Sequence, residues 1–317
     1  MGMNLRSVWR RAVVAAAGLA LLAAAPSTAA PLPENFTFFG GIPSELTNPN
    51  GSLPGTNDYS CRPTARHPNP VVLVHGTGGG SQTNWGAYAP LLKNNGYCVF
   101  SFTYGALPGA PWPVNQIGGT RPLATSAQQL RSMVERVLTA TGAKKVDLIG
   151  HSQGTLMPSY FVKNLGGAGK VGKYVSLAPL WRGTGGDLGK AVSVFVRGLN
   201  APDPYFPVFE SIGDMLPGSR FLDTIWTGGT PYSRGVEYTN ISTRFDELVL
   251  PYTSGQVDGP PGTKVTNIVV QDTCAQDLSD HLAIAGSRRA AYFVLNALDP
   301  QHPRPVPCYV VPPFTGA

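Results

Sequence analysis

Residues 150–154 read Gly-His-Ser-Gln-Gly, a G-x-S-x-G pattern that follows the short apolar stretch 146–149. In this pattern a sharp turn from a strand into a helix raises a serine hydroxyl above a sheet, and the glycines keep Cβ atoms out of the turn. Because the chain holds 38 glycines, the pattern alone arises easily by chance. The surrounding sequence must therefore decide whether Ser152 is a nucleophile.

A serine hydroxyl needs a base to remove its proton, and a third group must hold that base in the right tautomer. On an elbow of this kind the chain order is Ser, then acid, then His. Only His281 and His302 follow Ser152 among the five histidines. His302 lies in a proline-rich stretch typical of a surface strap, whereas His281 comes just after the last expected strand. The sequence therefore predicts His281 as the base.

The acid is expected at the end of the penultimate strand. Asp246 follows that strand directly, with Glu247 beside it as the natural competitor. Asp272 follows the same strand as His281, and Asp280 is adjacent to His281 in sequence, which makes a triad geometry awkward. We therefore predict Asp246 as the acid; the alternative is a solvated loop carboxylate.

Ester hydrolysis also needs two N–H donors aimed at the developing oxyanion. One donor is expected from the main chain of Gln153, immediately after the nucleophile. The second is expected from Thr77, in the glycine-rich loop 75–80 that follows a buried strand. The alternative for this loop is a tight turn only. His151, inside the elbow, is interpreted as a packing residue.

The elements that position these residues alternate between strands and helices. Strands are expected at 71–74, 98–102, 146–149, 174–178, 237–242 and 264–271, and helices at 85–95, from Thr125 or Ser126 to Gly142, at 155–165 and at 282–298. The alternation predicts a mostly parallel central sheet with helices on both faces.

Residues 179–235 interrupt this alternation with an aromatic-rich stretch that includes a possible short helix at 188–199. We interpret the stretch as a cap-like insertion or acyl-binding wall; a loop that only buries its aromatic side chains is an equal alternative. The proline-rich tail 300–313 is expected to strap back over the body.

The first 29 residues have the features of a signal peptide. Arg6, Arg10 and Arg11 precede the apolar stretch 12–25, and residues 27–29 offer a small-x-small cleavage site. The apolar stretch is short for a membrane span, and no later stretch reaches 18 apolar residues. The chain is therefore expected to be secreted, by the general or the twin-arginine route.

Composition narrows the possible partners. The net charge of +6 falls to +3 without the three leader arginines, and no basic stripe with interleaved aromatic residues indicates nucleic-acid binding. Residues 30–317 suffice for one α/β domain. We expect a monomer without a cofactor.

The four cysteines are Cys61, Cys98, Cys274 and Cys308. An even number in an exported chain predicts two disulfides with three possible pairings, of which local pairing, 61 with 98 and 274 with 308, is the simplest. The spacing shows neither C-x-x-C nor H-E-x-x-H, so we expect no metal site.

In their order, these motifs resemble the secreted bacterial lipases of the α/β-hydrolase fold. The resemblance covers most of the mature chain and rests on residues 59–61, 74–78, 96–98, 150–154, 178–179, 183–184, 246–251 and 280–281. It implies hydrolysis of acylglycerols or other carboxylic esters and a Ser152–Asp246–His281 triad. It also implies an oxyanion hole at Thr77 and Gln153, and the local disulfide pairing.

The sequence therefore predicts a secreted serine hydrolase that forms an acyl-enzyme on Ser152. Its expected substrate is a lipid or other ester, which it meets at an oil–water interface. A cutinase-like polyesterase and an acyltransferase acting on cell-envelope lipids are alternatives. A hydrolase-like protein that binds partners without catalysis is a further alternative from a different class.

Overall fold

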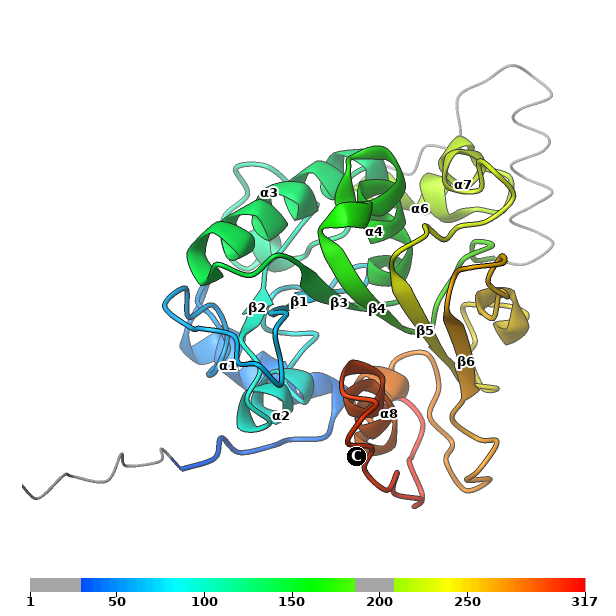
Figure 1. Cartoon of the computed structure of the whole chain (residues 1–317). Helices are drawn as coiled ribbons and strands as arrows, with labels where there is room; N and C mark the ends of the chain where they lie inside the picture. Colours follow the sequence, from blue (N-terminus) through cyan, green and yellow to red (C-terminus); the bar gives the residue numbers. More distant parts are fainter. Residues whose placement is uncertain (1–29, 186–207, 317) are drawn as a thin grey trace, which may run out of the picture. The chain divides into compact units, whose positions relative to one another are not determined.

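A six-stranded parallel sheet forms the centre of the computed structural model, which describes residues 30–185 and 208–316 (Figure 1). The strands are β1 (Val71–Val74), β2 (Val99–Ser101), β3 (Val146–His151), β4 (Val171–Leu177), β5 (Glu237–Ser242) and β6 (Val265–Val269). Their order in the sheet is β2-β1-β3-β4-β5-β6, and every neighbouring pair is parallel. The expected signal peptide, residues 1–29, and the helix expected at 188–199 lie outside the described residues.

Helices cover both faces of this sheet, which confirms the predicted fold class. The helices are α1 (Ile42–Thr47), α2 (Tyr88–Asn94), α3 (Leu123–Thr141), α4 (Gln153–Asn164), α6 (Ser211–Met215), α7 (Arg220–Ile225) and α8 (Arg288–Leu298). Short 3-10 turns are η1 (Phe38–Gly41), η2 (Val114–Gln116), η3 (Gly167–Gly169), η4 (Tyr252–Gly255) and η5 (Ala283–Ala285). Figure 1 shows α3 and α4 on one face and α2 and α8 on the other. None of the helices described is long and apolar enough to cross a membrane.

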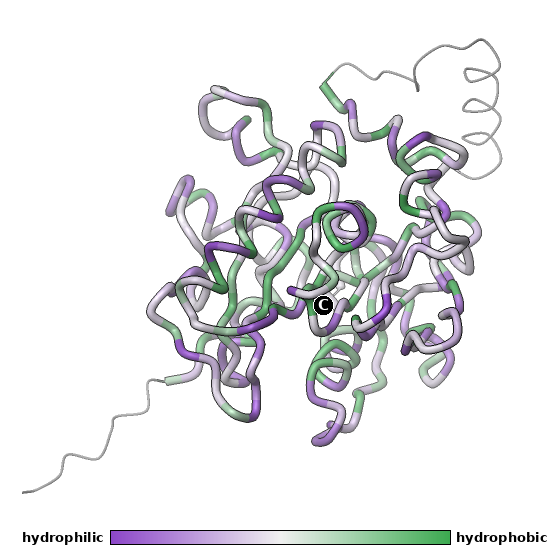
Figure 2. The backbone as a smooth tube through the Cα atoms, turned by 45° about the horizontal axis from the view of Figure 1, so that its top comes forward, coloured by the Kyte–Doolittle hydropathy of each residue, from purple (hydrophilic) through white to green (hydrophobic). Residues whose placement is uncertain are grey.

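Alternate residues of each strand pack into separate cores. Val72 and Val74 of β1 join the side chains of α3 and α4, whereas Val71 and Leu73 join those of α2 and α8. Both faces of β1 are fully buried, which explains its uninterrupted apolar sequence. Figure 2 shows the same distribution, with hydrophobic residues along the central strands and hydrophilic residues along the outer turns.

Helix α3 begins earlier than predicted. The prediction of a cap at Thr125 or Ser126 is wrong, because α3 starts at Leu123. Its first N–H donates to the carboxylate of Asp214, 2.7 Å away and 91 residues later in the chain. A distant carboxylate thus replaces a local capping residue. Gly142 ends the helix in the left-handed conformation, as expected.

The single closing helix predicted over 282–298 is instead the turn η5 followed by α8. Ser287 separates them and caps α8 by accepting the N–H of Ala290. The break brings Gly286 against the N-terminal segment, where a Cβ on this glycine would lie 2.2 Å from the main-chain nitrogen of Phe38.

Two disulfides join the chain ends to the body. Cys61 bonds to Cys98, the residue before β2, and Cys274 bonds to Cys308. The local pairing is therefore confirmed. The tail also contacts the loop after β6, where Leu278 donates to the carbonyl of Val311 at 3.0 Å.

Candidate active site

Ser152 lies at a strained turn between β3 and α4. Its backbone angles are φ 53° and ψ −126°, in a region that non-glycine residues rarely adopt. A Cβ on Gly150 would lie 2.0 Å from the carbonyl oxygen of Gly154, and one on Gly154 would lie 2.0 Å from that of Val74. The two glycines are therefore a steric requirement of this elbow, as the sequence pattern predicts.

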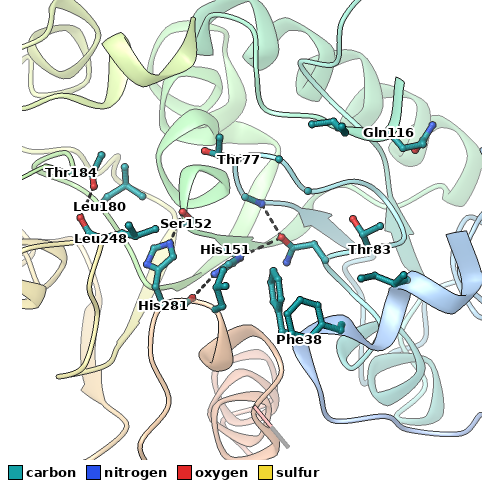
Figure 3. Close-up of a pocket in the computed structure, with 18 of the residues that line it drawn as sticks. Phe38, Thr77, Thr83, Gln116, His151, Ser152, Leu180, Thr184, Leu248 and His281 are labelled. Atoms are coloured by element: carbon teal, nitrogen blue, oxygen red, sulfur yellow. Dashed lines mark hydrogen bonds between the residues drawn. The ribbon is translucent and has the colours of Figure 1, made fainter. Parts of the chain in front are cut away.

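The structure brings Ser152, His281 and Asp246 together in one hydrogen-bonded chain. Figure 3 shows the part of it that joins Ser152 to His281. The Oγ of Ser152 lies 2.7 Å from Nε2 of His281, and Nδ1 of His281 lies 2.9 and 3.0 Å from the two carboxylate oxygens of Asp246. A carboxylate only accepts, so the ring proton resides on Nδ1 and Nε2 is free to accept the serine proton. His281 and Asp246 are both buried.

The competing carboxylates have other partners. Glu247 accepts the main-chain N–H of His281 at 3.1 Å but does not bond the ring. Asp272 pairs with Arg244 on the surface. Asp280 accepts the N–H groups that begin η5, from Leu282 and Ala283.

The other histidine considered as a base lies elsewhere. His302 is an exposed partner of Asp299, 2.9 Å away in the strap. The geometry therefore favours His281 over His302, and Asp246 over its neighbours.

The loop after β1 leaves one amide for a ligand. The N–H groups of Gly76, Gly78 and Gly79 donate to Asn84 Oδ1, Gly118 O and Gly76 O, at 3.0, 2.9 and 3.1 Å. The N–H of Thr77 has no such partner among the described residues, and Thr77 lies exposed at the wall of the cavity next to Ser152. Gln153 is the first residue of α4, where main-chain N–H groups lack partners within the helix.

A buried histidine holds this loop. His75 stacks on the ring of Tyr104, with centroids 4.1 Å apart, and its Nε2 accepts the N–H of Tyr104. Its Nδ1 donates to the carbonyl of Gly76 at 2.8 Å. Burial lowers the pKa of His75 to about 4, so the ring is neutral at pH 7. Sequence reasoning missed this role, because nothing local to residue 75 indicates Tyr104 as its partner.

His151 is also neutral at pH 7. The pKa of His151 is lowered to about 3, mainly by burial and secondly by the nearby His281. Its Nε2 donates to the main-chain carbonyl of His281 at 2.9 Å. The expectation that His151 packs rather than reacts agrees with this burial.

A cavity of about 470 Å³ opens beside Ser152. Figure 3 shows Leu180, Thr184 and Leu248 on one side of Ser152 and Thr83 and Gln116 on the other. The lining of the cavity is mostly apolar. It includes Phe38, Phe39, Ile42, Ile117, Leu180, Met215, Leu248, Val249 and Leu282, together with the polar Glu45, Thr83, Asn84 and Gln116. The volume lies within the range of small-molecule sites.

Part of this wall was missed from the sequence. Phe38, Phe39 and Ile42 belong to the N-terminal segment, in which the sequence predicts no site residue. The two adjacent phenylalanines, Phe38 and Phe39, are the sequence feature that could have indicated this part of the wall. In the parts of the chain that the structure describes, no group of three or more metal-binding side chains gathers.

Comparison with known proteins gives a consistent family and fold. A family model described as "Lipase (class 2)" matches residues 68–281. The chain is 33% identical over 96 residues to a triacylglycerol lipase of Pseudarthrobacter phenanthrenivorans, an alignment that covers 29% of this chain and only 27% of that protein.

Two solved structures have the same fold at low sequence identity. Lipase B of Aspergillus fumigatus matches with a TM-score of 0.57 and 18% identity, over 81% of this chain and 57% of that one. The mature lipase BlEst2 of Bacillus licheniformis matches with a TM-score of 0.53 and 13% identity, over 75% and 94% of the two chains. The described residues therefore adopt an α/β-hydrolase fold.

Proposed function

The chain belongs to the class 2 lipase family, and on that premise we propose that it is a serine ester hydrolase with Ser152 as its nucleophile. One observation carries the proposal. The Ser152–His281–Asp246 chain of hydrogen bonds lies at an apolar cavity large enough for an acyl group.

In the first half-reaction Oγ of Ser152 attacks the ester carbonyl carbon while Nε2 of His281 takes the hydroxyl proton. The carbonyl π electrons move to its oxygen, and the oxyanion accepts from the N–H groups of Thr77 and Gln153. Asp246 stabilises the imidazolium and holds its orientation. The tetrahedral intermediate then collapses, and His281 returns the proton to the departing alcohol oxygen, which leaves an acyl-enzyme.

In the second half-reaction water attacks the acyl-enzyme carbonyl, and His281 takes one of its protons. The new intermediate collapses by breaking the bond to Oγ of Ser152. His281 returns its proton to that oxygen, and the fatty acid leaves. No step requires a group other than these side chains, two main-chain amides and water.

We propose acylglycerol esters as the substrates. The mostly apolar lining of the cavity suits an acyl chain, and the relative from Pseudarthrobacter phenanthrenivorans is named a triacylglycerol lipase. Leu180, Thr184 and Met215, all within 179–235, supply one wall, which favours the interpretation of that insertion as part of the acyl pocket. The segment 186–207 lies outside the described residues.

We further propose that the mature protein is exported as one domain, residues 30–317, and acts as a monomer. Two disulfides support export, because such bonds persist in oxidising compartments. Mass spectrometry of the protein recovered from the medium of the producing cells tests this proposal. A first residue near Ala30 is expected, and retention of the Arg10-Arg11 segment in a cytosolic protein would contradict it.

Three ester classes, measured side by side, test the substrate. We expect emulsified triacylglycerol to be cleaved, with Ser152→Ala as the inactive control. Preferential release of monomers from a polyester film would instead identify a polyesterase, and acyl transfer to an added alcohol faster than hydrolysis would identify an acyltransferase. Absence of turnover on every ester would favour a binding protein.

A further inference from the structure

We propose that His151 and Asn84 are positioning residues: His151 fastens the base to the nucleophile elbow, and Asn84 fixes the oxyanion loop that lies against this elbow. This inference rests on the proposed function. Neither side chain supplies a reacting atom in the mechanism above. Both are almost fully buried, with exposed fractions of 2% for His151 and 3% for Asn84.

His151 connects the elbow to the base. It precedes Ser152 directly, and its Nε2 donates to the main-chain carbonyl of His281 at 2.9 Å. Because a carbonyl only accepts, the ring proton must reside on Nε2. On its other side the N–H of His281 donates to Glu247, 3.1 Å away. The main chain of the base is therefore held at both its N–H and its carbonyl, independently of the contacts of its ring.

Asn84 holds the oxyanion loop. Its Oδ1 accepts the N–H of Gly76 at 3.0 Å, next to Thr77, and lies 3.3 Å from Nδ1 of His151. A Cβ on Gly76 would lie 3.1 Å from Cβ of Ser152 and 3.2 Å from Nδ1 of His151. The loop thus lies directly against the elbow, and Asn84 fixes the direction of its first amide. Figure 3 shows the bond between His151 and His281 as a dashed line.

The side-chain amide of Asn84 is oriented so that its oxygen, and not its nitrogen, faces Gly76 in the oxyanion loop. Its Nδ2 has no partner among the described residues. Turning the amide over would let Nδ2 donate to Nδ1 of His151 but would remove the acceptor from Gly76. A buried N–H without an acceptor is costly, so the oxygen stays on Gly76. Asn84 therefore acts mainly on the loop, and His151 mainly on the base.

Two isosteric substitutions test these roles. His151→Phe keeps an aromatic ring but has no N–H for the His281 carbonyl, and Asn84→Leu keeps the volume but offers no acceptor to Gly76. Misplacement of catalytic groups by about 1 Å can cost about 100-fold in rate, so we expect kcat per titrated active site to fall by about 10- to 100-fold in each variant. KM should change by less than about threefold, because both side chains are almost fully buried and neither is assigned a hydrogen bond to the substrate.

Conservative variants separate hydrogen bonding from packing. The amide of His151→Gln can donate to the same carbonyl, and the carboxylate of Asn84→Asp can accept from Gly76. Each should recover kcat to within about fivefold of the wild type. His302→Phe, at an exposed histidine outside the site, is the matched control and should leave kcat unchanged. If His151→Phe does not fold, His151→Asn replaces it, since its amide is too short for the carbonyl and the same loss is expected.

Three results would overturn the proposal. The first is a kcat per site within twofold of the wild type in the isosteric variants. The second is an equal loss of kcat in the conservative and the isosteric variants. The third is a rise in KM of the isosteric variants at unchanged kcat. Ser152→Ala is measured in the same series. Retained activity in Ser152→Ala would refute the proposed function itself, whereas an inactive Ser152→Ala beside a fully active His151→Phe would refute only this inference.

Discussion

Replacing Asp246 with Asn tests how the base is oriented. Nδ1 of His281 donates to Asp246, whose Oδ1 also accepts the main-chain N–H groups of Leu248 and Val249 at 3.0 and 2.8 Å. In Asp246→Asn the amide oxygen must stay at that position to accept the two N–H groups. The NH₂ group therefore takes the place of Oδ2, which lies 3.0 Å from Nδ1 of His281.

An NH₂ group at that place needs an acceptor, which drives the ring proton of His281 from Nδ1 to Nε2. Nε2 then cannot accept the proton of Ser152, 2.7 Å away. The substitution also removes the charge that stabilises the imidazolium. We expect kcat to fall by about 10⁴-fold, the loss known for the equivalent change in a serine protease triad. This loss corresponds to about 5 kcal/mol of activation free energy.

The assay is hydrolysis of a soluble p-nitrophenyl ester at pH 7, with rates normalised to active sites. Glu247→Gln is the matched control, because within the described part of the chain this exposed neighbour accepts the main-chain N–H of His281 and makes no hydrogen bond to its ring. Its loss should stay below about tenfold. The reasoning would be refuted if Asp246→Asn kept more than a tenth of the wild-type kcat, or if both variants lost activity equally.

Three further predictions concern stability and specificity. Burial raises the pKa of Asp147 to about 6. A raised carboxyl pKa means that the contribution of Asp147 to the free energy of unfolding is largest below about pH 4 and falls by roughly 3 kcal/mol as the pH rises through 6. Asp147→Asn should flatten this dependence in calorimetric scans between pH 4 and 7, and an unchanged slope would contradict it. Replacing Cys274 and Cys308 with Ser removes a disulfide of sequence separation 34. The free energy of unfolding, measured in urea titrations, should fall by about 4 kcal/mol. A loss below about 1 kcal/mol would argue against the disulfide as a constraint on the unfolded chain. Leu180→Trp narrows the cavity, so the kcat/KM ratio of long- to short-chain p-nitrophenyl esters should fall at least tenfold, and an unchanged ratio would place the acyl chain elsewhere.

The sequence predicts which side chains meet at the site because their placement follows from the order of strands. In a parallel sheet, the residues just after consecutive strands gather at one edge. Ser152, Asp246 and His281 each follow a different strand, so their chain positions alone indicate that they meet. The choice of Asp246 over Glu247 is harder to make from the sequence. In the structure the ring of His281 contacts Asp246, whereas Glu247 contacts the main-chain N–H of His281.

Features that depend on distant partners are not visible in local patterns. Asp214 begins α3 from 91 residues away, which no capping pattern at residues 122–126 reveals. Phe38 and Phe39 line the cavity because the N-terminal segment packs against Gly286. The neutral rings of His75 and His151 follow from burial in the folded chain, which composition does not show.

Covalent labelling tests the central claim most directly. A fluorophosphonate reacts fastest with a serine whose proton a neighbouring base removes. Intact-mass and peptide mass spectrometry of the purified protein should show one adduct per chain, located on Ser152, and none in Ser152→Ala. An adduct on another residue, or equal labelling of Ser152→Ala, would contradict the account.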